Sequence, residues 1–548
     1  MTTDESHDRA AADAIAHGRA ALGIEFGSTR IKACLIGPDF QVLATGAYEW
    51  DNELVDGRWT YPLDAVISGL QAAYAALADD AESRHGARPA TLAGIGISAM
   101  MHGYLAFDGA GELLVPFRTW RNTSTGQAAA ELTEALGFNV PLRWSVAHLY
   151  QAVLDGEEHL GRLASLTTLA GYVHRRLTGR NVLGVGDASG MFPIDPATGG
   201  YDEGMLAQAD ELIGRRMPEL KLAPLLPEVL PAGADAGALT PEGAALLDPS
   251  GALRPGIRFC PPEGDAGTGM VATNAVAPRT GNVSVGTSVF AMVVLEHALA
   301  AVHPEIDVVT TPAGDLVAMV HCNNGTSELN AWAGVFGEFA AALGIETDAD
   351  AVYSALLGAA LEGAADGGGV LAYNFLSGEP IAGLEAGRPL IARTPGSALT
   401  LANLMRAQGY GVFATLNLGM RVLADEGVAI DRLVGHGGLF RTPLVGQRLL
   451  AAAVDAPIAV ESSAGEGGAW GIAVLAAYLG QASDRSLADY LANEVFAAGG
   501  ASVVEPEAAD VTGFARYLER FQAGLDIERA AVATLNDDGR TGTEKEEA

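Results

Sequence analysis

The sequence predicts an α/β protein with a mixed sheet and at least two domains, and three observations lead to this prediction. The chain has 548 residues, too many for a single hydrophobic core, and 49% of them are hydrophobic. Apolar runs typical of strands alternate with segments of helical spacing. A strand–turn–strand pattern also occurs twice, at residues 24–36 and 283–295, and such hairpins make a sheet mixed rather than purely parallel.

Each of the two turns is a glycine followed by two hydroxyl residues. The turn residues are Gly27, Ser28 and Thr29 in the first hairpin and Gly286, Thr287 and Ser288 in the second. Backbone N–H and hydroxyl groups in such a turn line a concave surface that binds anions. The glycine lets the backbone approach a ligand closely, because it has no Cβ atom. Two such turns facing each other would bind the phosphates of one nucleotide; the alternative is two unrelated hairpins with ordinary turns.

The other expected elements alternate between strands and helices. The helix expected over 63–78 has apolar residues at helical spacing, as Val66, Leu70 and Tyr74 illustrate. In the first half we also expect strands over 40–50, 92–98 and 104–107 and mostly helices over 125–177. In the second half we expect helices over 327–343, 397–425 and 514–525 and a strand over 432–434.

Composition narrows the classes of function. Lys and Arg number 33 against 67 Asp and Glu, which gives a net charge of −34. Such a charge disfavours binding to nucleic acid or to an acidic membrane surface, so an anionic nucleotide would need local donors and a metal ion. Cys34, Cys260 and Cys322 are widely spaced, which fits a reducing cytoplasm better than disulfides or a zinc site. The apolar stretch at 469–479 is too short to span a bilayer.

A Pro- and Gly-rich stretch before the second hairpin places a domain boundary near residues 275–280. Residues 1–20 are polar and Ala-rich, without the apolar core of a signal peptide, and we treat them as an N-terminal extension. The two domains are then expected over 21–276 and 277–530. Residues 531–548 end in a charged segment, and we expect them to form a disordered tail.

Several short motifs, in this order along the chain, resemble those of the FGGY family of carbohydrate kinases in the actin-like ATPase superfamily. The segments are 24–32, 186–190, 264–267, 282–288, 376–379 and 434–444. The resemblance implies two actin-like (ribonuclease H-like) domains, each with a mixed β-sheet flanked by helices. It also implies an ATP cleft between them and a sugar held mostly by the N-terminal domain. The implied enzyme is a transferase that moves the γ-phosphoryl group of ATP to a sugar hydroxyl.

Asp265 stands where the family keeps its catalytic aspartate, directly before the second phosphate hairpin. A carboxylate within hydrogen-bond reach of the attacking hydroxyl can accept its proton during phosphoryl transfer. The structural alternative is that Asp265 only caps a helix that begins at Ala266, since Asp is common at that position. The nearby phosphate turn favours catalysis.

The resemblance also implies ATP and Mg²⁺ as cofactors. The two turns would bind the phosphates, and Gly437, Gly438 and Thr442 would border the adenine, unless they form an ordinary strand-to-helix turn. Glu25 occupies the position of an aspartate that helps to hold the magnesium. It keeps the charge but is one methylene longer, and Mg²⁺ retains waters that can absorb such a shift.

The sugar would contact residues in two segments of the N-terminal domain. Met101 and His102 belong to a Met-His-Gly sequence that lines the pocket in xylulokinase-like members. Those members commonly have glutamine at the position of Met100. The second segment, Trp120, Arg121 and Asn122, matches a Trp-Asn-Asp or Trp-Gln-Asp element whose polar residues can read sugar hydroxyls. Asp265 would face the same substrate.

The most favoured substrate is therefore a ketopentose of the xylulose or ribulose type, with another polyol or a sugar acid as the alternative. Two alternatives come from other classes: a non-catalytic actin-like protein that binds nucleotide, and a polymerising or chaperone-like ATPase. The expected partner is a small sugar, without nucleic acid or a membrane. The sequence allows a homodimer and fits a cytoplasmic protein.

Overall fold

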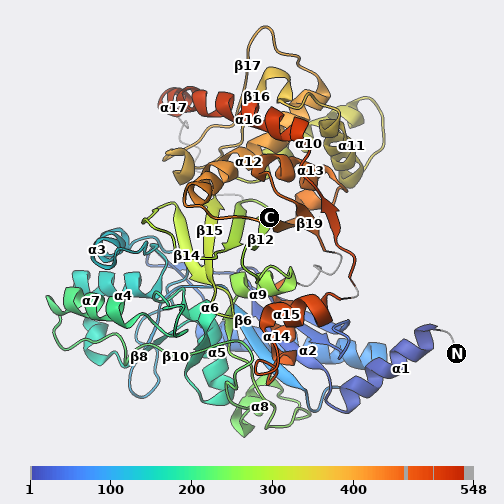
Figure 1. The fold of residues 1–548 in the computed structure, drawn as a ribbon. Coiled ribbons are helices and arrows are strands. Elements are labelled where there is room, and N and C mark those ends of the chain that lie inside the picture. Colours follow the sequence, from blue (N-terminus) through green and yellow to red (C-terminus); the bar gives the residue numbers. More distant parts are fainter. Residues whose placement is uncertain (1–2, 462–466, 498, 536–548) are drawn as a thin grey trace. The chain divides into compact units, whose positions relative to one another are not determined.

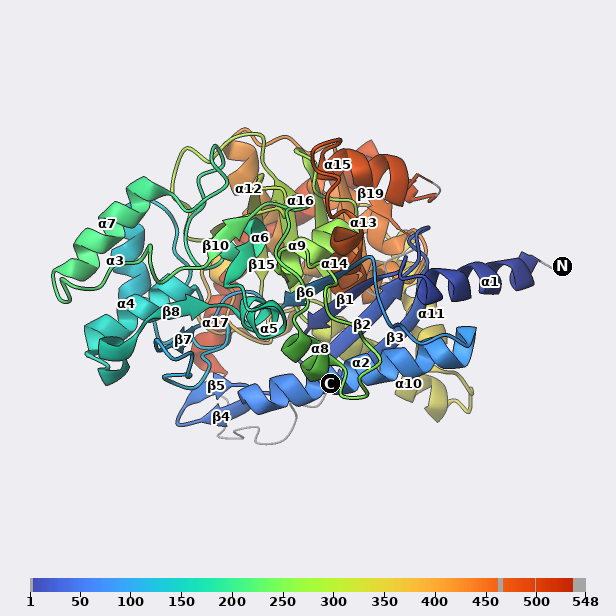
Figure 2. The same cartoon turned by 90° about the horizontal axis from the view of Figure 1, so that it is seen from below.

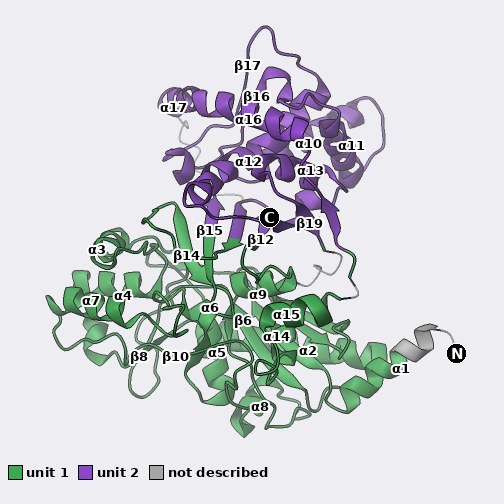
Figure 3. Cartoon of the chain, in the orientation of Figure 1, with its two compact units in different colours: residues 1–280, 293–318, 461–500 green, residues 281–292, 319–460, 501–548 purple. Residues whose placement is uncertain are grey.

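The computed structural model describes residues 3–461, 467–497 and 499–535. The chain divides into two compact units (Figure 3). Unit 1 contains residues 1–280, 293–318 and 461–500, and unit 2 contains residues 281–292, 319–460 and 501–548. Residues 293–318, which begin at the end of the second hairpin, and the described residues of 461–500 thus pack with the N-terminal part of the chain.

The sheet of unit 1 contains five strands in the order β11-β6-β1-β2-β3. Figure 1 labels β6 of this sheet, and Figure 2 also labels β1, β2 and β3. The strands are β1 (Ala21–Phe26), β2 (Arg30–Ile36), β3 (Val42–Glu49), β6 (Gly94–Ala99) and β11 (Glu263–Gly264). The first three are antiparallel neighbours, as the predicted hairpin requires. β6 is parallel to β1, and β11 is parallel to β6, so the sheet is mixed.

Helix α14 (Gly467–Ala477) packs on one face of this sheet against Gly23 of β1. A Cβ atom on Gly23 would lie 2.1 Å from the carbonyl oxygen of Ala469 and 2.6 Å from the backbone nitrogen of Ala473. The helix backbone therefore touches the strand backbone directly. Most of the apolar stretch at 469–479 lies in this helix, which ends at Ala477 and is largely buried in unit 1.

Helix α2 (Leu63–His85) covers the opposite face, and Figure 2 shows it lying along the strands. A Cβ atom on Gly46 of β3 would lie 2.1 Å from the carbonyl oxygen of Ala73 in this helix. Gly46 pairs through Ala33 with Ile24, the neighbour of Gly23 in sequence. Because successive residues of a strand point to opposite faces, the two helices enclose the sheet.

The remaining elements of unit 1 lie around this core. Its helices are α1 (Thr3–Ala16), α3 (Gly126–Leu136), α4 (Ser145–Asp155), α5 (Leu169–Thr178), α6 (Val185–Ala188), α7 (Glu203–Gly214), α8 (Pro241–Leu247), α9 (Asp265–Ala272) and α15 (Leu487–Tyr490). Its further strands are β4 (Glu53–Val55), β5 (Arg58–Thr60), β7 (Leu105–Phe107), β8 (Ser165–Thr167), β9 (Val182–Gly184), β10 (Glu228–Leu230) and β14 (Ile306–Thr310).

The second sheet has the strand order β14-β15-β13-β12-β18-β19-β20. The strands not yet introduced are β12 (Thr280–Val285), β13 (Val289–Val294), β15 (Leu316–Cys322), β18 (Arg432–Gly437), β19 (Ile458–Val460) and β20 (Ser502–Val504). Read from β19 to β15, this order matches the order from β11 to β3 in unit 1. The second hairpin, β12 and β13, takes the place of the first, β1 and β2. The duplication predicted from the two hairpins therefore extends to the sheets that contain them.

Helices and a small hairpin complete unit 2. They are α10 (Ser327–Ala342), α11 (Ala349–Leu361), β16 (Val370–Tyr373), β17 (Leu390–Arg393), α12 (Leu401–Asp425), α13 (Val445–Val454), α16 (Ala508–Ala523) and α17 (Leu525–Thr534). No described helix is both long enough and apolar enough to cross a membrane.

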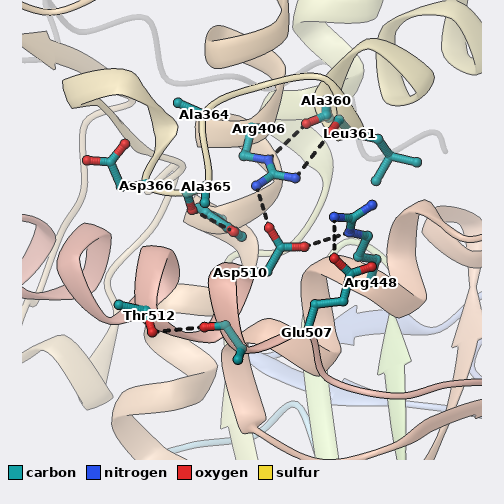
Figure 4. Close-up of polar contacts among 12 residues, drawn as sticks. Ala360, Leu361, Ala364, Ala365, Asp366, Arg406, Arg448, Glu507, Asp510 and Thr512 are labelled. Carbon is teal, nitrogen blue, oxygen red and sulfur yellow. Dashed lines mark hydrogen bonds and ion pairs between the residues drawn. The ribbon is translucent and has the colours of Figure 1, made fainter.

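A buried ion-pair network joins three helices of unit 2 (Figure 4). The carboxylate of Asp510 in α16 accepts hydrogen bonds from Arg406 in α12, at 2.9 Å, and from Arg448 in α13, at 2.6 Å. Arg406 also donates to the carbonyl oxygen of Ala360 at 2.9 Å. Removal of one partner would leave a buried charge without compensation, so the network fixes how these helices pack.

The termini differ from the sequence-based expectation in part. Within the N-terminal extension, Ala11, Ala14 and Ile15 of α1 are buried. We expected a disordered tail over 531–548, and this start is too early, because α17 continues to Thr534. The Ala-rich run at 530–533 favours helix, which explains the difference. Residues 536–548 lie outside the described residues, and the domain boundaries at 276 and 530 stay predictions.

We predict that Gly23→Ala destabilises the protein. Its Cβ atom would collide with the backbone of α14, and overpacking of this kind costs about 1–3 kcal/mol. Urea unfolding should show a lower midpoint for this variant. Gly109→Ala is the matched control, because no atom lies within 4 Å of a Cβ atom at that position. Equal midpoints for the two variants would contradict the close packing of α14 on β1.

Candidate active site

The first predicted phosphate turn connects β1 and β2 in unit 1. The indole Nε1 of Trp50 donates to the carbonyl oxygen of Gly27 at 2.8 Å. The hydroxyl of Tyr61 donates to the backbone carbonyl oxygen of Ser28 at 2.6 Å. In a trans peptide the N–H group points away from the carbonyl. The N–H groups of Ser28 and Thr29 therefore point away from these aromatic side chains, and Thr29 is exposed. This orientation suits the binding of an anion.

Glu25 lies near the end of β1, opposite Lys32 in the register of the hairpin. Burial and the nearby charge of Asp265 raise the pKa of Glu25 to about 7, against the lowering effect of Lys32 and of a hydrogen bond from the backbone of Ala469. A Cβ atom on Gly468 would lie 2.3 Å from Oε1 of Glu25. The first turn of α14 thus contacts this carboxylate.

Asp265 is held where β11 ends and α9 begins. Its Oδ1 accepts the backbone N–H groups of Met101, at 3.3 Å, and Ala266, at 2.9 Å. Burial raises the pKa of Asp265 to about 6, although these two N–H groups lower it. The N-cap of α9 is Gly264, so Asp265 is the first helical residue. A residue that only capped α9 would not need the hydrogen bond from Met101. This bond ties the carboxylate to a separate loop.

His102 follows β6 in a strained backbone conformation, with φ of 71°. Its Nδ1 lies 3.2 Å from the carbonyl oxygen of Gly190. A carbonyl can only accept, so Nδ1 carries the hydrogen and Nε2 is left as an acceptor in the neutral ring. Burial lowers the pKa of His102 to about 3, so the ring is neutral near pH 7. Trp144 stacks on this ring at 6.4 Å between centroids.

The segment with Trp120, Arg121 and Asn122 is fixed mainly by Trp59. The side chain of Asn122 accepts the N–H of Trp59 at 2.9 Å and donates to its carbonyl oxygen at 2.8 Å. The guanidinium of Arg121 lies 4.1 Å from the ring of Trp59 and donates to Asn52. Trp120 is 39% exposed. A direct contact of Asn122 with a sugar stays a prediction.

Sequence reasoning missed the residues that surround the His102 loop from other parts of unit 1. Trp144 and Gly190 are brought to it by the fold, and no local motif marks either position as a contact of His102. Asp187 was noted only as part of the 186–190 resemblance. It is fully buried, and its Oδ2 accepts the hydroxyl of Thr168 at 2.6 Å. Burial and the charge of Asp265 raise the pKa of Asp187 to about 7.

The second predicted phosphate turn lies in unit 2, between β12 and β13. Its carbonyl groups are held by the segment before α10: Gly325 N–H donates to Thr287 at 2.7 Å, and Thr326 N–H donates to Gly286 at 2.9 Å. Gly286 and Thr287 are exposed, and Ser288 is partly exposed. As in the first turn, the bound carbonyls orient the following N–H groups away from the protein segment that holds them.

The predicted adenine loop begins at the end of β18. Gly437 has a φ of 106°, and a Cβ atom there would lie 2.2 Å from the carbonyl oxygen of Val285 in β12. The loop is therefore adjacent to the strand that leads into the second turn. A Cβ atom on Gly438 would meet no atom within 4 Å. Thr442 is partly exposed after a short 3₁₀ turn at 438–440.

The structure therefore brings Glu25, Asp265 and the Met101–His102 loop together in unit 1, and the second turn and Gly437 together in unit 2. Within the described part of the chain, no three His, Cys, Asp or Glu side chains form a group that could hold a metal ion by themselves. The functional roles assigned from sequence to all these residues, including Gly27 and Thr442, stay predictions.

We predict that Asp265→Asn raises the melting temperature more at pH 8 than at pH 5. The folded-state pKa of about 6 lies above the usual 3.8, so the contribution of Asp265 to stability is present below about pH 4 and lost as the pH rises through 6. Asparagine stays neutral and keeps an oxygen for the two N–H groups. Thermal unfolding at both pH values measures the difference.

Asp108→Asn provides a control with the opposite sign. A hydrogen bond from Arg162 lowers the pKa of Asp108, so its loss should reduce stability at pH 8. A melting-temperature difference for Asp265→Asn that is the same at both pH values would contradict the raised pKa.

Comparisons with known proteins identify the family of this chain. The family model for the N-terminal domain of the FGGY family of carbohydrate kinases matches residues 20–249, and the model for the C-terminal domain matches residues 281–480. A xylulose kinase from Haemophilus influenzae is 23% identical over 433 residues, covering 76% of this chain and 82% of that protein.

Solved structures show the same fold. A xylulose kinase from Rhodospirillum rubrum has a TM-score of 0.75 at 22% identity, covering 93% of this chain and 99% of that chain. A gluconate kinase from Lactobacillus acidophilus has a TM-score of 0.74 at 17% identity, covering 94% and 98%. The predicted α/β fold with two actin-like domains is confirmed. The chain belongs to the FGGY family of carbohydrate kinases.

Proposed function

We propose that this carbohydrate kinase phosphorylates a ketopentose of the xylulose or ribulose type, with Asp265 accepting the proton of the attacking hydroxyl. The similarity to xylulose kinases supports the substrate class. The observation that carries the role of Asp265 is its position: one carboxylate oxygen is anchored by the N–H groups of Met101 and Ala266. The other oxygen is then oriented for a substrate. With a pKa of about 6, the carboxylate is ionised near pH 7.5 and can act as a base.

His102 supplies a second contact for the acceptor. Its Nε2 is an acceptor in the neutral ring, so it can take a hydrogen bond from a sugar hydroxyl. Met101 packs against Gly264, where a Cβ atom would lie 2.2 Å from its Cγ, and can cover an apolar part of the sugar. Together these side chains would align the hydroxyl, which is most of what an enzyme must do for phosphoryl transfer.

ATP is the donor that membership of this kinase family implies. In unit 1 the first turn would donate hydrogen bonds to phosphate oxygens, and in unit 2 the second turn would do the same. Gly437 and Gly438 would let the flat adenine approach the backbone. The convergence of the two turns on one nucleotide stays a prediction.

Magnesium fits the residues around Glu25. Mg²⁺ prefers oxygen ligands and usually binds through one or two carboxylates together with waters and phosphates. Glu25 is such a carboxylate. The nearby charge of Asp265 raises the pKa of Glu25, and a bound divalent cation would offset the same repulsion between the two carboxylates. When bound, the ion would neutralise phosphate charge, and Glu25 would hold it directly or through water.

A sugar acid is the second candidate substrate. Arg121 places a cationic group in the segment predicted to contact the sugar, where the family pattern has asparagine or glutamine. The fold is also shared with a gluconate kinase. A carboxylate on the substrate would interact favourably with a guanidinium group in this position.

We expect ADP release to depend on D-xylulose or D-ribulose in a panel that also contains hexuloses, polyols and gluconate. Asp265→Asn should lower kcat by about 10²–10⁴-fold, because it removes the proton acceptor. Asp248→Asn, at a carboxylate with no assigned role in the site, is the matched control and should retain activity. Preference for gluconate would support the second candidate. ATP turnover that no sugar changes, and that Asp265→Asn leaves intact, would refute the proposal.

We also expect Gly437→Ala and Gly438→Ala to differ. Gly437→Ala should lower stability by about 1–3 kcal/mol, because its Cβ atom collides with Val285 at a positive φ. Gly438→Ala should leave stability unchanged but weaken ATP binding roughly tenfold, since the methyl group would occupy the space of the adenine. Thermal unfolding and nucleotide titration measure both effects. Unchanged ATP affinity in Gly438→Ala would exclude this loop from the nucleotide site.

A further inference from the structure

Glu263 is a buried carboxyl group that the mechanism above does not use. It stands two residues before Asp265 and is 1% exposed. It belongs to β11, where it pairs with Ser98 of β6. A carboxyl group so deep in a protein is costly unless its oxygens have hydrogen-bond partners. Its partners therefore indicate what it is for.

The two oxygens of Glu263 accept backbone N–H groups at the start of α6. Gly186 donates to Oε1 at 3.4 Å, and Asp187 donates to Oε2 at 3.0 Å. A Cβ atom on Gly184 would lie 2.1 Å from Oε1, and one on Gly186 would lie 2.4 Å from Oε2. The carboxyl group thus fits into a space that exists only because these two positions are glycine.

The same segment continues to the contact with His102. The hydroxyl of Ser189 donates to the carbonyl oxygen of Gly186 at 2.6 Å, which closes the turn. The next residue, Gly190, provides the carbonyl oxygen that accepts Nδ1 of His102. A Cβ atom on Gly190 would lie 2.7 Å from that nitrogen, so the ring and the turn are in direct contact.

The strand that carries Glu263 holds the other side of the same loop. Gly264 packs against the side chain of Met101, and Asp265 accepts the N–H of Met101. The Met101–His102 loop is therefore fixed on one side by residues 264–265 and on the other by residues 186–190. Glu263 links these two sides through hydrogen bonds.

We propose that Glu263 is a positioning residue that sets the place of His102 relative to Asp265, and thereby the alignment of the acceptor hydroxyl. The inference rests on the proposed roles of Asp265 and His102. An error of about 1 Å in such an alignment can cost on the order of 100-fold in rate, whereas a merely structural carboxyl group would affect stability alone. The hydrogen bonds described above for the two nucleotide turns involve neither Glu263 nor residues 186–190.

The test compares Glu263→Ala with Asp248→Ala. Asp248 is also a buried carboxylate of unit 1 that accepts two backbone N–H groups, from Ser250 at 3.1 Å and Leu253 at 2.9 Å. With D-xylulose, D-ribulose and gluconate as acceptors, we expect kcat to fall about 10–100-fold in Glu263→Ala, with KM for ATP changed less than twofold. Glu263→Gln, which keeps the shape and one carbonyl oxygen, should restore part of the rate. Asp248→Ala should keep the wild-type kcat.

A second readout does not need turnover. In ¹⁵N-histidine spectra of the unliganded protein, the ring signals of His102, assigned by their loss in His102→Gln, should shift in Glu263→Ala and not in Asp248→Ala. Glu263→Gln provides the same comparison if the alanine variant does not fold. Unshifted His102 signals, or a kcat equal to that of the wild type, would overturn the proposal. A wild type inactive on every acceptor with shifted His102 signals would refute the proposed substrates and leave the positioning role supported.

Discussion

Three parallel strands that end at one edge of a sheet bring the unit 1 site together. β1, β6 and β11 are adjacent and parallel, so their carboxyl ends lie side by side. The first turn follows β1, the Met101–His102 loop follows β6, and Asp265 follows β11. Chemical groups from distant parts of the sequence thus meet without a long loop to carry them. In open α/β sheets, ligands commonly bind at this edge.

The carboxyl groups near this edge are buried, and burial disfavours their charged form. Glu25, Asp187 and Asp265 all have raised pKa values, and in each case burial is the main cause. A fold selected for stability alone would avoid such a cluster, because each group would be cheaper to keep in water. The close packing of α14 on β1 contributes stability to the same unit.

The sequence was sufficient for features that depend on neighbouring residues. Both hairpins, the helix after β3 and the long helix α12 follow from periodicity and turn chemistry, and the ordered motifs predicted the family. What could not be predicted depends on contacts between distant segments. The bond of Gly190 to His102, and the return of α14 to the first sheet, have no local signal. The two hydrogen bonds between the amide of Asn122 and the backbone of Trp59 likewise have no local signal.

Glu25 and Gly468 illustrate how a departure from the family pattern can be absorbed. The longer side chain of Glu25 reaches to 2.3 Å from the place that a Cβ atom on Gly468 would take. An aspartate at position 25 would withdraw the carboxylate by one methylene, but a Cβ atom on Gly468 would still lie 2.8 Å from Oγ1 of Thr268. Because the Glu25 carboxylate contacts this position, substitutions at 25 and 468 should be energetically coupled.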